Sequence, residues 1–123
     1  MTDERRRKRS CNTQQALDLQ LAATVERGGF SSVMLTERQG IPLAAAGNVS
    51  ADEEICVLAP RLVPGNRLWQ GRVAIDNGPE RLVTIAPIKT DVGHLYLCGV
   101  GGVSSAVMAE LLHGSRGVHR ILA

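Results

Sequence analysis

The sequence predicts an α/β domain with the element order α-β-β-α-β-β-β-α. Its clearest signal is residues 28–48, where two short apolar runs flank a polar turn that ends at Gly40. Residues 68–76 then alternate between apolar and polar, and two nearly continuous apolar runs follow. Alternation is typical of half-buried strands, and continuous runs of strands covered on both faces. Only one Phe, one Trp and one Tyr are present, so an aliphatic core is expected, which favours regular layered packing.

The first half of the chain predicts a helix and a β-hairpin. A helix over residues 13–27 follows from apolar residues at every fourth position, Leu17, Leu21 and Val25, and Gly28-Gly29 ends it. Strands are predicted at 30–36 and 41–46. Because Pro42 has no N–H to donate, the second of these strands is expected at an edge of the sheet.

A second helix is predicted from Ser50, with three carboxylates in its first turn, where the helix dipole favours negative charge: Asp52, Glu53 and Glu54. We expect these three carboxylates near the surface. Its apolar stripe would consist of Ile55, Leu58, Ala59 and Leu62. Pro60 is expected to kink or shorten the helix, and residues 64–66 to end it.

Three strands and a helix complete the prediction. The strand at 68–76 places Trp69, Val73 and Ile75 on one face, and Asn77-Gly78 marks a turn after it. Strands at 82–88 and 94–100 form an antiparallel pair. A last helix over 103–113, with Val103, Val107 and Leu111 on one stripe, is expected to stop at Gly114, before a short amphipathic segment at 116–123.

Charge divides the chain into a basic tail and a nearly neutral body. Residues 10–123 hold nine basic and ten acidic side chains, a net charge of −1, and five basic residues stand together before them: Arg5, Arg6, Arg7, Lys8 and Arg9. We therefore predict a disordered tail over residues 1–11 and one domain over 12–123. The tail could serve as a weak tether to anionic membranes. Specific nucleic-acid binding is not expected, because neighbouring aromatic residues are missing.

Cysteine and histidine spacing predicts neither a disulfide framework nor a metal site. Cys11, Cys56 and Cys98 are odd in number and far apart, which favours a reducing cytoplasm and buried, inert thiols. No apolar run reaches the length of a membrane span. No cofactor is expected.

Catalytic interpretations are disfavoured. Residues 99–104 follow a strand and precede a helix, but they lack the lysine of a P-loop and the third glycine of a dinucleotide loop, so tight packing explains them better. No nucleophile motif joins Ser104 or Cys98 to a histidine. Arg61, Arg67 and Arg72 could be arginine fingers, but solvated or cross-strand roles are favoured.

In its order of elements, residues 12–123 resemble the roadblock family, named for dynein light chains, and especially its bacterial MglB-like members. The resemblance rests on GGFSSVMLTERQG after a helix, the acidic helix start at 50–54, GPERLVTIAPI, GHLYLCGV and the terminal GVHRIL. It implies a five-stranded antiparallel sheet with helices on both faces, dimerisation, and regulation or scaffolding of small Ras-like GTPases, as in cell polarity or motility. At Pro60 the chain departs from the family's usual helix.

Edge chemistry predicts how two copies would meet. Pro42 blocks one sheet edge, whereas residues 68–76 contain no proline, so we expect a homodimer, or a heterodimer with a paralogue, joined along that strand. Trp69 is either an interface anchor or a core residue. The expected interface residues are Ile55, Leu58, Leu62, Trp69, Val73 and Ile75, and the expected contacts to a GTPase are Glu53, Glu54, Arg61 and Arg72.

Two alternatives to a GTPase-binding module stay open. A profilin- or GAF-like sensory domain would need a roomy pocket with converging polar groups. A scaffold could pair only with other roadblock proteins. An enzyme is disfavoured, since no catalytic constellation is present.

Overall fold

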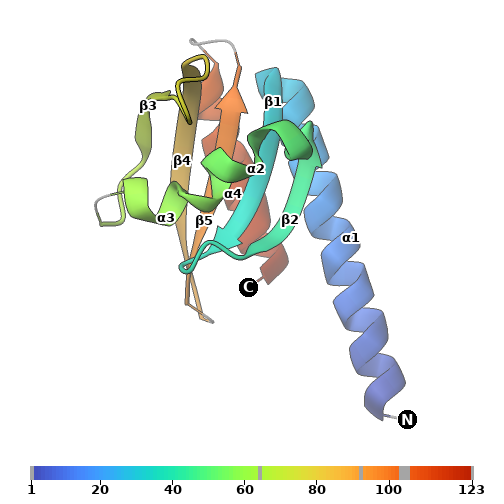
Figure 1. Ribbon diagram of the computed structural model, residues 1–123. Helices are drawn as coiled ribbons and strands as arrows, with labels where there is room; N and C mark the ends of the chain where they lie inside the picture. Colours follow the sequence, from blue (N-terminus) through green and yellow to red (C-terminus); the bar gives the residue numbers. More distant parts are fainter. Residues whose placement is uncertain (1, 64, 92, 103–105, 123) are drawn as a thin grey trace.

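A computed structural model describes residues 2–63, 65–91, 93–102 and 106–122, and the backbone alone for residues 2–11. One five-stranded antiparallel sheet, in the order β2-β1-β5-β4-β3, forms the middle layer. The long helices α1 and α4 cover one face, and the short helices α2 and α3 cover part of the other (Figure 1). The predicted α/β class and element order are confirmed.

The strands lie close to their predicted positions. They span β1 (Phe30–Glu37), β2 (Pro42–Gly47), β3 (Trp69–Val73), β4 (Arg81–Thr90) and β5 (Gly93–Gly101). The central strands β1, β5 and β4 hold the longest buried runs, as their apolar sequences predict. β2 is an edge strand, as Pro42 predicts, and β3 is the other edge.

The turn between β3 and β4 lies one residue earlier than the Asn77-Gly78 pair predicts, with Asp76 and Asn77 at its centre. Asp76 and Asn77 both adopt positive φ, 50° and 60°, and the N–H of Gly78 donates to the carbonyl of Ile75 at 2.8 Å. A type I′ turn requires positive φ at both central positions, and Asp and Asn tolerate positive φ better than most residues.

Helix α1 (Thr2–Gly28) begins earlier than predicted. The expected start at Thr13 is wrong because no Gly or Pro interrupts residues 2–12, and the Arg and Lys residues there are good helix formers. The N-terminal part of α1 projects beyond the sheet (Figure 1). Leu17 and Leu21 are buried against the sheet, as predicted.

Helix α4 (Val107–Leu122) continues through Gly114, where the sequence predicted its end. Val103 to Ser105, and with them the expected helix start, lie outside the described residues. Gly114 and Gly117 are buried against α1: a Cβ at Gly114 would lie 2.5 Å from Thr24 Oγ1, and one at Gly117 would overlap the amide of Gln20. These glycines therefore serve close helix packing rather than termination.

Helix α2 (Val49–Val57) is followed by the short α3 (Ala59–Leu62), so the predicted interruption near Pro60 is confirmed. The buried residues of α2 are Asp52, Ile55 and Cys56. Leu58, expected on the buried stripe, lies at the break and is only half-buried. None of the described helices has the length and apolar character that crossing a bilayer requires.

Candidate functional site

The candidate interaction surface combines the free edge of β3 with the α2 and α3 side of the sheet. Within the described chain, β3 pairs with β4 alone, in a register that places Trp69 opposite Ile85 and Val73 opposite Arg81. Its other side offers backbone N–H and C=O groups at the edge of the sheet. Such an edge is a template for pairing with another strand.

Apolar side chains accompany this edge. Trp69, Val73 and Ile75 are half-buried and pack against the core cluster on the α2 side, as their alternation predicts. The indole of Trp69 lies over Gly71, because a Cβ there would fall 2.7 Å from two of its ring atoms. Trp69 is thus partly buried in the core and partly exposed on the surface. Its expected roles as a core residue and as an interface anchor are therefore compatible.

The remaining predicted interface residues lie on α2 and near α3. Ile55 is fully in the core, whereas Leu58 and Leu62 are half-buried. Leu62, like Trp69 and Val73, packs against the same cluster. The structure therefore gathers most of the predicted interface residues on one face, with Ile55 beneath rather than on the surface.

The predicted partner-binding residues separate into two groups. Glu53, Glu54 and Arg61 are exposed on α2 and α3. Arg72 is also exposed, but it alternates with Gly71 and Val73 on β3 and so projects from the opposite face of the sheet. Gln70, on the same face as Arg72, donates its amide to Thr84 Oγ1 at 3.0 Å.

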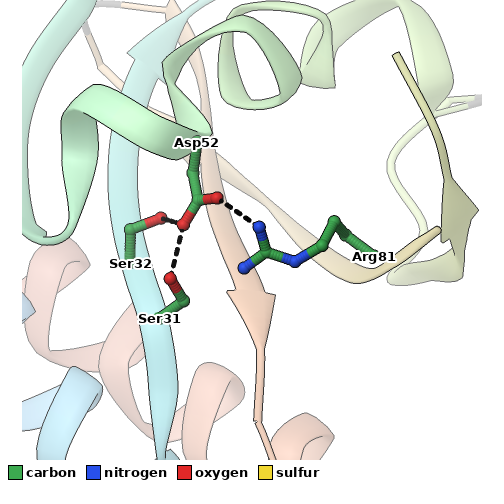
Figure 2. Close-up of polar contacts among 4 residues, drawn as sticks. All are labelled: Ser31, Ser32, Asp52 and Arg81. Carbon is green, nitrogen blue, oxygen red and sulfur yellow. Dashed lines mark hydrogen bonds and ion pairs between the residues drawn. The ribbon is translucent and has the colours of Figure 1, made fainter. Parts of the chain in front are cut away.

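Asp52 is not on this surface, and its predicted exposure is wrong. Its side chain is 0% exposed. Ser31 and Ser32 of β1 each donate a hydroxyl hydrogen bond to Oδ2 at 2.7 Å, and Nη1 of Arg81, at the start of β4, donates to Oδ1 at 2.9 Å (Figure 2). The carboxylate thus ties the first turn of α2 to two strands.

A helical pattern in the sequence could have revealed this burial. Asp52 precedes Ile55, Cys56 and Ala59 by three, four and seven positions, and all three are buried. A residue at that spacing shares their helix face. A charged side chain on a buried face needs partners, and the two serines and the arginine supply them.

Cys98, one of two buried cysteines on this side of the sheet, is poorly suited to nucleophilic chemistry. Cys56 and Cys98 are both free and buried, as predicted. The pKa of the Cys98 thiol lies well above its usual value, because its side chain hydrogen-bonds with Cys56 and because it is buried; the charge of Asp52 adds a smaller effect. Since the thiolate is the reactive form, this environment keeps the thiol inert.

The glycines at and just after the end of β5 pack tightly. Gly101 and Gly102 adopt positive φ, 80° and 99°. A Cβ at Gly102 would lie 2.6 Å from Val107, and one at Gly99 2.6 Å from Phe30. These contacts confirm the packing interpretation of Gly99 to Gly102; Ser104 lies outside the described residues. No group of three metal-ligating side chains occurs among the described residues.

The order and packing of the helices and strands are similar to those of several solved structures. The gliding protein MglB from Thermus thermophilus superposes with a TM-score of 0.63 and 14% identity, covering 89% of this chain and 90% of that one. The chain has a roadblock-like fold. MglB from Myxococcus xanthus (TM-score 0.65, 11% identity, 87% of each chain) and a Roadblock/LC7 domain from Streptomyces avermitilis (TM-score 0.61, 16% identity, 85% of this chain and 96% of that chain) are also similar.

The roadblock resemblance of the sequence is therefore confirmed for the fold. Neither a scan against protein-family models nor a search of curated proteins found a match. At identities of 11–16%, the likeness describes backbone architecture and does not transfer the roles of residues.

Proposed function

We propose that this roadblock-like chain forms a two-fold homodimer along β3, and that the dimer regulates or scaffolds a small Ras-like GTPase in the cytoplasm without catalysing a reaction. The observation that carries the proposal is the free edge of β3 beside half-buried apolar side chains. Strand addition would satisfy the edge, and the partner would cover Trp69, Val73 and Ile75. The GTPase as partner class rests on the resemblance to the roadblock family.

In such a dimer, α2 and α3 from both copies would lie on the same side of a continuous sheet. Each copy contributes Glu53, Glu54 and Arg61 as exposed charges, while Leu58 and Leu62 are available for packing between copies. A charged, two-fold surface suits a regulated and transient contact better than an obligate apolar one. Arg72, on the other face of the sheet, would contact only a partner that reaches around the edge of β3.

Proline substitution on β3 tests the dimer. Successive residues of an edge strand direct their N–H groups alternately toward the neighbouring strand and toward the open edge. Arg72→Pro and Val73→Pro are therefore a matched pair. The variant whose lost N–H pointed toward β4 loses a hydrogen bond within the sheet and is destabilised. The variant whose lost N–H pointed toward the open edge loses a hydrogen bond only to the partner strand.

Light scattering and circular dichroism separate the two effects. The unmodified chain should have twice the monomer mass at micromolar concentration, and one of the two variants should be folded and monomeric. A monomeric unmodified chain would refute the dimer. A folded dimer in both variants would exclude β3 as the joining strand.

Charge reversal tests the partner surface. Glu53→Lys with Glu54→Lys should weaken binding to a cognate small GTPase and leave the dimer intact. Asp18→Lys with Glu26→Lys, at exposed positions on α1, changes the net charge equally and should bind normally. Binding should depend on the nucleotide of the GTPase, and the chain alone should not bind GTP. If every co-encoded small GTPase fails to bind in either nucleotide state, a scaffold for other roadblock proteins, including a heterodimer with a paralogue, replaces this proposal.

The basic run from Arg5 to Arg9 has a secondary role in the proposal. We expect it to add weak attraction to an anionic membrane, about 1 kcal/mol for each basic residue near the surface. This attraction should fade as ionic strength rises through the physiological range, because exposed charges are screened there. Retention on anionic vesicles that does not depend on salt would contradict this electrostatic tether.

A further inference from the structure

A second polar surface lies on the opposite side of the sheet from α2. A hollow of about 600 Å³ opens between the end of β4 and the outward face of α4. The side chains around it that bear charge or can become cationic are Lys89, His113, Arg116, His119 and Arg120. Its size falls within the usual range for sites that bind small molecules, roughly 300–1,000 Å³.

The described residues around the hollow carry cations but no carboxylate side chain. The single ion pair in the described part of the chain, Arg81 with Asp52, lies elsewhere. Acidic side chains line neighbouring depressions: Glu110 shares one with His113 and Arg116, and Asp91 shares another with Lys89 and His119. The body of the protein has a net charge of −1, so this concentration of positive charge is local.

Helix stability alone does not account for this cluster. The dipole of α4 favours basic residues in its last turn, which explains His119 and Arg120. It does not explain His113 and Arg116, which lie earlier in the helix, or Lys89, which comes from β4. Spacings of three and four residues place the α4 members on one face, where like charges repel unless an anion lies between them.

We infer that this hollow binds a phosphate group carried by a small molecule or a lipid headgroup. Two arginines offer planar pairs of N–H donors, which match the oxygens of a phosphate, and the lysine adds a compact positive charge. A phosphate with two negative charges balances the three cations Lys89, Arg116 and Arg120 better than a carboxylate with one negative charge does. The site does not depend on the proposed GTPase contact, because that contact uses the α2 side of the sheet.

Two probes distinguish the possible sources of the phosphate. Inorganic pyrophosphate, titrated by calorimetry, reports binding of a soluble ligand. Sedimentation with phosphatidylcholine vesicles, with and without phosphatidic acid, reports binding of a headgroup. Both measurements use the full chain, and a version with glutamine at Arg5 to Arg9 removes any contribution of the basic run to vesicle binding.

The test variant is Arg116→Gln with Arg120→Gln, and its matched control is Arg38→Gln with Arg67→Gln. All four arginines are exposed, so both variants are expected to fold, which circular dichroism checks. Binding should weaken about tenfold for each arginine lost from the hollow and remain unchanged in the control. Pyrophosphate binding lost in the test variant alone supports a soluble ligand, and vesicle binding lost in the same way supports a headgroup.

Three results would overturn the inference: equal loss in both variants, no binding of either probe, or equally tight binding of a glutamate-rich peptide. The first would indicate only general attraction of anions. The last would indicate an acidic protein segment as the ligand.

Discussion

Replacing Asp52 with alanine is the most direct test of how α2 is held on the sheet. The substitution removes the acceptor of three hydrogen bonds and leaves Ser31, Ser32 and Arg81 without their common partner. Because Asp52 is 0% exposed, water cannot replace the lost contacts without opening the first turn of α2.

The expected cost follows from this burial. Removing one partner of a buried ion pair destabilises a protein by about 3–5 kcal/mol. Arg81 retains 31% of its side-chain exposure and can partly rehydrate, which places the expected loss near the lower value. Ser32→Ala removes one hydrogen bond to the carboxylate and should cost about 1.5–3 kcal/mol.

Urea unfolding, followed by circular dichroism, measures these free energies. Glu53→Ala is the matched control, because it removes the neighbouring carboxylate from an exposed position and should change stability by less than about 0.5 kcal/mol. The double variant Asp52→Leu with Arg81→Met should recover much of the loss, since an apolar pair avoids burying a charge. If Asp52→Ala costs no more than Glu53→Ala, the carboxylate does not anchor α2.

Three further predictions concern packing, pH and the basic run. Gly114→Ala should destabilise the fold by about 1–3 kcal/mol, because the new methyl group would meet Thr24, which is buried and branched. Gly117→Ala would meet the flexible side chain of Gln20 and gain helix propensity, so the same urea assay should show almost no change in stability. The raised pKa of Cys98 predicts that stability falls as the pH rises above the thiol's usual value of 9.0, because the thiol ionises first in the unfolded chain. Cys98→Ala should weaken this fall in stability. A pH profile that Cys98→Ala leaves unchanged would contradict the prediction. Removing residues 1–10 should leave the melting temperature unchanged, and a clear decrease would show that this segment packs on the domain.

The fold was predictable where local chemistry and tertiary structure agree. The alternation of the strands and the effect of Pro42 each act within a few residues and appear as expected, and a turn forms one residue before the predicted Asn77-Gly78 pair. Gly114 was misinterpreted because a glycine in a helical segment usually signals its end. Only the contact with Thr24, far earlier in the chain, explains its place inside α4.

The candidate site was predictable in part for the same reason. The exposure of Glu53 and Glu54 follows from local sequence, and so does the apolar face of β3. The role of Asp52 depends on Arg81, which the β3–β4 hairpin brings back to α2. The basic hollow also joins β4 to α4, and its residues are separated along the chain by the whole of β5.

The two edges of the sheet differ in a way that limits assembly. At β2, Pro42 provides no N–H, and Gln14 of α1 donates its amide to the carbonyl of Leu43 at 3.1 Å, so part of that edge is already occupied within the chain. At β3 the corresponding groups are open. If copies pair only along β3, as we propose, each chain joins one other copy and has no second β3 edge to offer, so symmetric pairing would end in a closed particle instead of a fibre.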